Sequence, residues 1–322
     1  MASDDSFCLE IQEPLPREVF MQTNSKEDEQ HRGQGTKEVL KKRKAHYQKI
    51  LRELTMMSDM FLRNVLKDRD CAQEVLKIIF EEKNLELVEA ETQQDYKNLH
   101  GRSLELDCVA LTRDGRIFDI EVEGKSSRAD PKRARYHSGL LDMNILNPGE
   151  DFDNLPEMYT IFIVNGDVLK EGKIIYHIDR TIRESGRMFG DQSHVIYINA
   201  AFEKLLETTE EELAAEETAL CRLIHDFHCK NADEMHNKIL AKRVRELKET
   251  KKGVKRMCKE MDKIYQWGER EGERRGKRKN QKESTLRMGR KGYKEEEIAE
   301  ILNVSKGLVR KWLSEERGLM KA

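Results

Sequence analysis

The sequence lacks any long apolar run. No segment approaches the ~18 consecutive apolar residues that a transmembrane helix needs, and the first 14 residues are acidic without an apolar core. These absences predict a protein that neither spans a membrane nor carries a secretory signal, and we expect it in the cytoplasm.

Cysteine pairs are also lacking, and prolines number only five in 322 residues. The six cysteines are scattered and none forms a CxxC pair: Cys8, Cys71, Cys108, Cys221, Cys229 and Cys258. This spacing predicts reduced thiols and excludes a disulfide framework or a two-pair zinc site. His225 and His228, beside Cys229 in HDFHC, could bind a metal, but without a second ligand pair in the sequence we favour ordinary side chains.

Charge is balanced in total but not along the chain. The formal net charge is -2, yet residues 238–294 contain 22 Lys or Arg against 8 Asp or Glu. Apolar residues recur there at helical spacing in a narrow stripe. Two interpretations stay open for this basic helical arm. It packs by its stripe on the core or on a second copy of the chain in a homo-oligomer, or it follows a phosphate backbone with salt-dependent affinity.

Hydrophobic periodicity divides the chain into four parts. Residues 1–35 predict a disordered tail, 36–237 an α/β domain, 238–283 the basic arm with glycines at every fourth position from Gly268, and 284–322 a helical module. In the second part, helices over 36–83 and 130–146 accompany six predicted strands: 85–92, 104–111, 116–123, 158–164, 173–178 and 194–199. We therefore predict an α/β fold with a mixed central sheet flanked by helices.

The sharpest feature is the acidic segment FDIEVE. Asp119, Glu121 and Glu123 alternate with apolar residues, so on a strand they share one face. The turn Thr112-Arg-Asp-Gly predicts a hairpin that brings Asp107 of the preceding strand toward them. Burying several carboxylates together is costly unless a cation offsets their repulsion. The residues alone leave two interpretations, a solvated edge or a divalent-cation site with oxygen ligands.

Several blocks resemble one family in order and spacing. The segment NLHGRSLELDCVALTRDGRIFDIEVE, followed by KRARYHSGLLD, LPEMYTIFIVNGDVL, YHIDR and SHVIYIN, is similar to recombination-promoting nucleases and transposases of the PD-(D/E)XK nuclease superfamily. The likeness runs over about residues 57–199. It implies a restriction-endonuclease-like core and metal-dependent endonucleolytic cleavage of DNA, with Mg²⁺ or Mn²⁺ as the cofactor.

The resemblance also assigns catalytic residues. The family's hairpin aspartate falls on Asp107 and the first acid of its E-x-K or E-x-Q element on Glu121, so both would bind Mg²⁺ with the carbonyl of Val122. The third signature position falls on Glu123, where the family carries Lys or Gln. A carboxylate there could be another metal ligand or a general base, or could mark a site that no longer cuts. Lys125 could supply the missing cation if the strand extends that far.

Basic residues on the next helix are candidates for DNA contact. That helix carries Lys132, Arg133, Arg135 and Tyr136, which we expect to meet the DNA backbone or the scissile phosphate, with a solvated basic face as the alternative. Asp59 matches an acid in the family's N-terminal block, and we interpret it as a helix cap.

The last part resembles a DNA-binding motif. The segment EEEIAEILNVSKGLVRKWL is similar to the helix-turn-helix of resolvases and homeodomain-like proteins, whose second helix enters the major groove. That helix offers Lys306, Arg310 and Lys311, and a helical hairpin used only for packing is the alternative.

Two functional hypotheses result. The first is a Mg²⁺-dependent DNA endonuclease of the recombination-promoting type, with Asp107 and Glu121 holding the metal and Glu123 as an accessory acid. The second is a protein of the same fold that binds DNA without cutting it, which Glu123 keeps open.

Overall fold

The structure, a computed structural model, describes residues 42–96, 103–201 and 218–319. The chain divides into two compact units, residues 1–47 and 48–322, and the described part of the first unit is helical. The tail predicted over 1–35 lies outside the described residues. Within the described ranges, no helix is long and apolar enough to cross a membrane.

The second unit runs from helices into strands and ends in helices. The helices are α2 (Asp59–Leu66), α3 (Arg69–Ile79), α4 (Pro131–Ile145), α6 (Ala219–His228), α7 (Lys238–Glu249), α8 (Lys251–Arg290), α9 (Glu295–Leu302) and α10 (Lys306–Leu319). The strands are β1 (Leu87–Tyr96), β2 (Leu104–Thr112), β3 (Ile117–Glu123), β4 (Met158–Val164), β5 (Ile175–Ile178) and β6 (Ser193–Asn199). Short 3₁₀ helices lie at Ser126–Arg128, Phe152–Asn154 and Ala232–Glu234.

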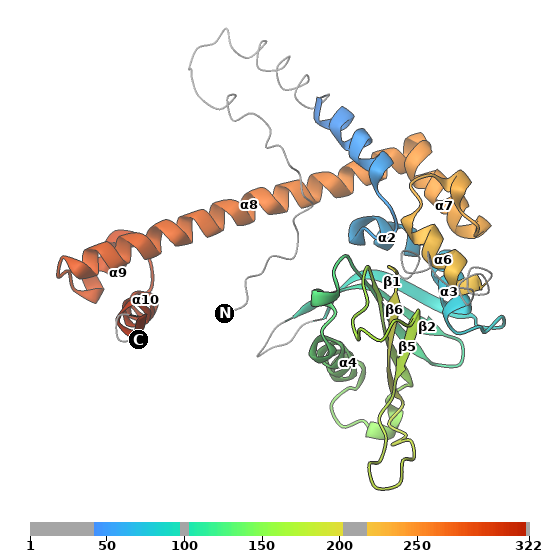
Figure 1. Ribbon diagram of the computed structural model, residues 1–322. Helices are drawn as coiled ribbons and strands as arrows, with labels where there is room; N and C mark the ends of the chain where they lie inside the picture. Colours follow the sequence, from blue (N-terminus) through green and yellow to red (C-terminus); the bar gives the residue numbers. More distant parts are fainter. Residues whose placement is uncertain (1–41, 97–102, 202–217, 320–322) are drawn as a thin grey trace. The chain divides into compact units, whose positions relative to one another are not determined.

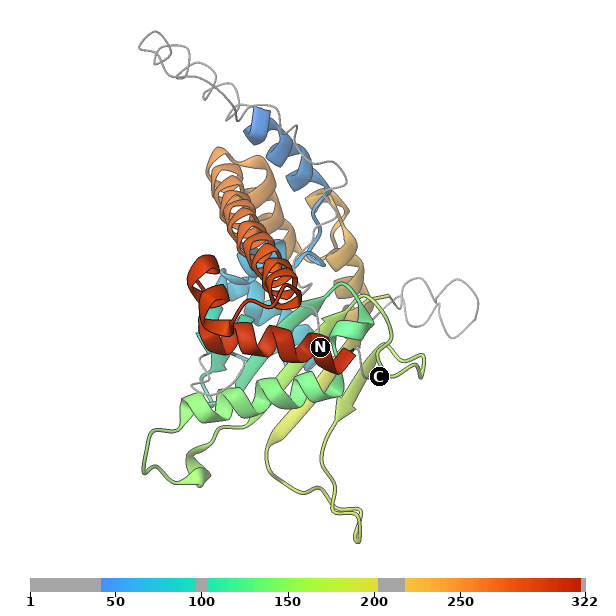
Figure 2. The same ribbon diagram turned by 90° about the vertical axis from the view of Figure 1, so that its left-hand side faces the viewer.

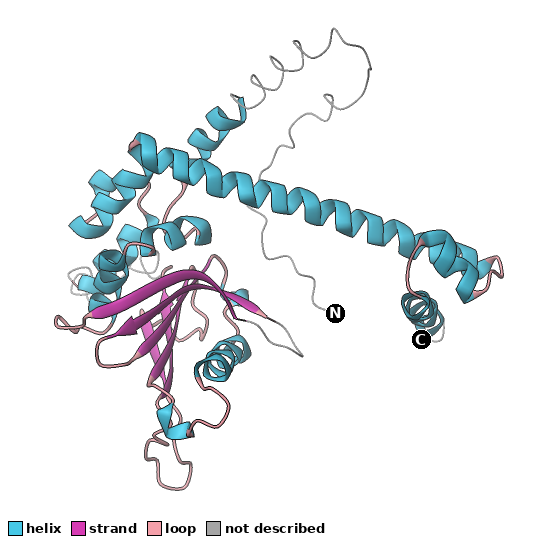
Figure 3. Ribbon diagram, turned by 180° about the vertical axis from the view of Figure 1, so that it is seen from behind, coloured by secondary structure: helices cyan, strands magenta, loops and turns pink. Residues whose placement is uncertain are grey.

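The strands form one mixed sheet in the order β1-β2-β3-β4-β6-β5 (Figure 3). β2 and β3 pair antiparallel through the predicted hairpin, in which Gly115 takes a φ of 91° that favours glycine. β3, β4 and β6 are parallel neighbours, and β5 returns antiparallel on β6. β4 is almost continuously apolar because it lies between two parallel neighbours and is buried on both faces. The predicted α/β class with a mixed central sheet is confirmed.

The alternation along β3 separates the two faces of the sheet. Phe118 lies on the face where Phe80, at the end of α3, packs edge-on against it with ring centroids 5.1 Å apart. Asp119 and Glu121 lie on the face covered by α4, which crosses the strands (Figure 2). α4 begins as predicted, with Asp130 accepting the backbone N–H of Lys132 as the N-cap. The acidic row is therefore covered by a helix, and its interpretation as a solvated edge is wrong.

The basic arm consists of α7 and a 40-residue helix, α8, that Figure 1 shows unbroken. A corner joins the two helices near Gly253, where an added Cβ would collide with the carbonyl oxygen of Glu246. Residues 265–280 of α8 are exposed, apart from the partly covered Glu271. The buried part of the apolar stripe comprises Leu240, Val244, Leu247, Met257 and Met261. The stripe therefore packs within the chain along the first part of the arm only.

The glycines of the arm do not interrupt α8. Gly268, Gly272 and Gly276 lie in its exposed stretch, where Glu271 forms ion pairs with Arg274 and Arg275 one turn away. The boundary predicted between 283 and 284 falls inside α8, whereas the one between 237 and 238 coincides with the N-cap of α7. The division into functional domains stays a prediction.

α9 and α10 pack against the end of α8. Asn303, in a left-handed conformation with a φ of 49°, ends α9, and the helices enclose a small core of Ile298, Val309 and Leu313 with Leu286 of α8. This is a helical hairpin at the predicted place. That α10 reads DNA stays a prediction.

Candidate active site

The site lies where the regular pairing of β2 with β3 ends, at Cys108 and Ile120. Beyond this point side chains bridge the strands. The backbone N–H of Asp107 donates to Glu121 Oε1 at 2.9 Å, and the N–H of Val122 donates to Asp107 Oδ2 at 3.1 Å. The structure thus brings together the three residues that the resemblance assigns to the metal.

Asp107, Asp119, Glu121 and Glu123 form an acidic cluster. Their carboxylates are buried and repel each other. Burial, followed by the charge of Glu121, raises the pKa of Asp107 well above its usual range. Burial, followed by the charge of Asp119, does the same to the pKa of Glu121. Burial raises the pKa of Asp119 to about 7, although the nearby guanidinium of Arg133 opposes the shift. A bound cation would favour the ionised form of all three groups.

Arg133 turns from α4 into the cluster. Its Nη2 lies 3.0 Å from Glu121 Oε2, its Nη1 pairs with Glu123, and the same Nη1 donates to the carbonyl oxygen of Arg128 at 3.0 Å. A positive charge therefore accompanies Glu123, where the resemblance led us to expect Lys or Gln. Lys125 does not take this place, because β3 ends at Glu123 and Lys125 is exposed in the following turn.

His137 is a site residue that sequence reasoning missed. Its Nδ1 lies 3.0 Å from Asp119 Oδ2, and Arg133 Nε donates to its Nε2 at 3.1 Å. Asp119, Glu121 and His137 are all buried, and each places a possible ligand atom within 4.8 Å of the others. The available signal was the spacing of four residues from Arg133, which puts both side chains on one face of α4.

Asp59 is not the helix cap that we expected. Ser58 occupies the N-cap position of α2, and Asp59 is the first residue of the helix itself. Asp59 accepts a hydrogen bond from Arg63 Nη2 at 2.9 Å. Arg63 also donates to Glu105 at 2.8 Å and lies 3.7 Å from Asp107 Oδ1. Arg63 therefore ties α2 to the acidic end of β2.

The α4 residues predicted to contact DNA divide between two sides of the helix. Lys132, Arg135 and Tyr136 are exposed, whereas Arg133 points into the acidic cluster. Because α4 covers that cluster, its exposed cations lie on the element nearest to the candidate site. The structure therefore places Arg133 in the site and the other three on the exposed side of α4.

The α10 residues predicted to contact DNA belong to the separate helical hairpin. Lys306, Arg310 and Lys311 are all exposed. Lys306 pairs with Glu296 of α9, and Arg310 Nε lies 3.1 Å from Glu295 Oε2. These pairs link α10 to α9 at the surface of the hairpin.

A family model described as a PD-(D/E)XK nuclease family transposase matches residues 59–283, which is more than half of the chain. The chain belongs to this family. The searches of curated proteins and of solved structures gave no match. Membership of the PD-(D/E)XK family supports a function of the nuclease or transposase type, with DNA as the substrate. The matched region contains the whole acidic cluster and most of α8, whereas α9 and α10 lie outside it.

The residues of the acidic cluster fit a divalent metal. Its acidic side chains offer oxygen donors, which Mg²⁺ and Mn²⁺ prefer. Asp119 Oδ1 is buried and has no hydrogen-bond partner among the residues that the structure describes. A cation near Asp107, Asp119 and Glu121 would therefore satisfy the orphaned oxygen and offset the repulsion between the carboxylates.

Proposed function

We propose that the chain is a cytoplasmic, metal-dependent DNA endonuclease of the recombination-promoting type. Asp107 and Glu121, with the carbonyl of Val122, hold Mg²⁺ or Mn²⁺. The observation that carries this proposal is the convergence of buried carboxylates at the point where β2 and β3 stop pairing. The bound metal would polarise the scissile phosphate and lower the pKa of the attacking water.

The protein's own groups position the reaction. Arg133 fixes the carboxylates of Glu121 and Glu123 from one side, so that their orientation is set before DNA binds. Glu123, 8% exposed, is the accessory acidic residue. Its carboxylate acts as a base and accepts a proton from the attacking water. The imidazole of His137 holds Asp119 and links β3 to α4.

Exposed side chains bind the DNA backbone. Lys132, Arg135 and Tyr136 lie on α4, the helix that covers the acidic cluster, and contact phosphates there. The exposed residues 265–280 of α8 form further phosphate contacts, and Lys306, Arg310 and Lys311 contact DNA from α10, the expected major-groove helix. Because the contacts of α4 and α8 are with phosphates, affinity falls steeply as salt rises.

The test is nicking of supercoiled plasmid by the purified full chain with Mg²⁺ or Mn²⁺. The wild type should nick, whereas Asp107→Ala and chelator-treated wild type should not. All three should retard DNA on a gel, which separates cutting from binding. If wild type and Asp107→Ala nick equally little while both retard DNA, the endonuclease proposal is wrong.

That outcome would support the second candidate function, DNA binding without cleavage. The observation that favours it is the pairing of Arg133 with both Glu121 and Glu123, which neutralises carboxylates that a metal would otherwise use.

A further inference from the structure

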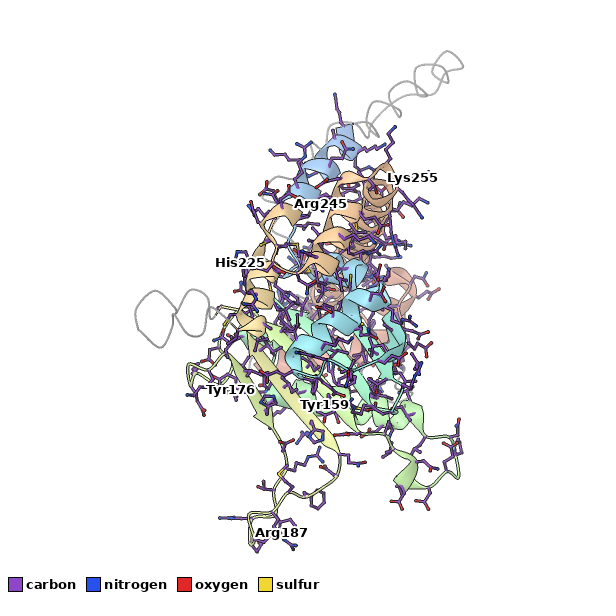
Figure 4. All side chains as sticks on the ribbon, turned by 90° about the vertical axis from the view of Figure 1, so that its right-hand side faces the viewer. Tyr159, Tyr176, Arg187, His225, Arg245 and Lys255 are labelled. Carbon is purple, nitrogen blue, oxygen red and sulfur yellow. The ribbon has the colours of Figure 1, made fainter. Side chains whose placement is uncertain are left out.

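A second cluster of possible metal ligands lies at the C-terminal end of α6, apart from the carboxylate cluster. His225, Asp226 and Cys229 each place a donor atom within 4.8 Å of the others. Cys229 is a reduced thiol, 8% exposed, and the His225 side chain is 36% exposed. Figure 4 shows His225 on α6, projecting outward from the helix. An ion could therefore reach the cluster from solvent.

Two of the three separations between the donors match those around a tetrahedral zinc ion. With Zn–N and Zn–O of about 2.0–2.1 Å and Zn–S of about 2.3 Å, neighbouring donors lie about 3.4–3.6 Å apart. His225 Nδ1 lies 3.5 Å from Cys229 Sγ and 3.5 Å from Asp226 Oδ1. His225 Nε2 also lies 4.0 Å from the same sulfur, so the thiol lies beside the ring edge between the two nitrogens, and the ring has to rotate before a nitrogen can share a metal with Cys229.

Asp226 is held in place by the segment that follows α6. Its Oδ1 accepts the backbone N–H of His236 at 2.7 Å, and its Oδ2 accepts that of Asn237 at 2.8 Å. A carboxylate has about four acceptor positions, so two remain for a ligand. The ring of His236 lies 4.7 Å from that of His225, between centroids. The fold thus supplies a second histidine that HDFHC alone does not contain.

We propose that His225, Asp226 and Cys229 bind Zn²⁺, with His236 at the fourth position. Thiolate and imidazole donors select zinc over Mg²⁺, so this site and the carboxylate cluster take different metals. The ion would join the end of α6 to the start of α7 and so brace the basic arm. The simpler alternative is a hydrogen bond from the Cys229 thiol to the carbonyl oxygen of His225, 3.4 Å away.

Cobalt substitution separates the two interpretations. The metal-free full chain is titrated with Co²⁺ under reducing conditions, and thiolate-to-cobalt charge-transfer absorption is recorded. We expect one equivalent to produce the band and one equivalent of Zn²⁺ to abolish it. Cys229→Ser should lose the band, whereas Cys221→Ser, on the same helix but outside the cluster, should keep it. Glu121→Gln should also keep it, because oxygen ligands produce no thiolate band.

Thermal unfolding gives a second readout that does not depend on the thiol absorption. Zn²⁺ should raise the Tm of the wild type and of Cys221→Ser, but not that of His225→Ala. His236→Ala should weaken Zn²⁺ binding by about tenfold or more. Circular dichroism of the metal-free variants checks that each one folds. If Co²⁺ gives no thiolate band with the folded wild type, the proposal is wrong.

Discussion

The acidic cluster and the basic arm hold charge in opposite ways. At the cluster, carboxylates from β2 and β3 are buried and meet side chains from two other elements, α2 and α4. Along residues 260–280 of α8, the cations are exposed and their ion pairs join residues three or four positions apart. Buried charge is costly and must be matched by tertiary structure, whereas exposed charge is screened by water. This contrast suits the cluster to a fixed chemical task and the arm to adaptable contact with phosphates.

The largest expected effect is the loss of cleavage when a buried acid is neutralised. Glu121→Gln should lower the rate of plasmid nicking by about 10³-fold or more, because a proposed metal ligand is lost. The exposed Glu86→Gln is the matched control and should nick normally. Equal nicking rates for the two variants would contradict the claim that cleavage depends on the buried acids.

The next largest effect on nicking is expected from Arg133, because it is the arginine of α4 that enters the acidic cluster. Arg133→Ala should reduce nicking by about 10–100-fold through loss of carboxylate positioning. Arg135→Ala, on the exposed side of the same helix, should mainly weaken DNA binding. Single-turnover nicking at saturating DNA distinguishes the two. A larger loss for Arg135→Ala than for Arg133→Ala would contradict the assignment.

Neutralising the arm should change binding without changing stability. Lys277→Gln with Arg278→Gln should lower the slope of log affinity against log salt by up to about 2. The Tm of this variant should stay close to that of the wild type, because both residues are exposed. Lys83→Gln with Lys170→Gln, also exposed but outside the arm, is the control. An unchanged slope in the arm variant would show that the arm is structural.

The smallest expected effect is a dependence of stability on pH in the metal-free protein. The pKa of Asp119 is raised to about 7 from an ordinary 3.8, so between these values the folded state binds more protons than the unfolded state. Stability should therefore fall as pH rises toward 7, with chelator present. Asp119→Asn should make this dependence shallower in a series of thermal melts, while Asp107 and Glu121, whose pKa values are also raised, supply the remainder. A Tm that increases over the same range in the wild type would contradict the shift.

Local sequence patterns predicted much of the fold. The alternation in FDIEVE, the Asp-Gly turn and the apolar run of β4 indicated the correct strands, and Asp130 and Pro131 marked the start of α4. Patterns of this kind depend on neighbouring residues and on burial of one face, so they can be recognised without the fold. The continuity of α8 through its glycines was less apparent, because helix propensity alone disfavours glycine.

The amino-acid sequence was enough to specify the strands, the hairpin, the acidic row and the basic arm. Tertiary packing was needed to establish that Arg133 rather than Lys125 accompanies Glu123, that His137 meets Asp119, and that His236 lies beside His225. These contacts join residues of different elements, and their formation depends on how the chain packs. Periodicity specifies which face a residue occupies, but packing specifies which side chains that face meets.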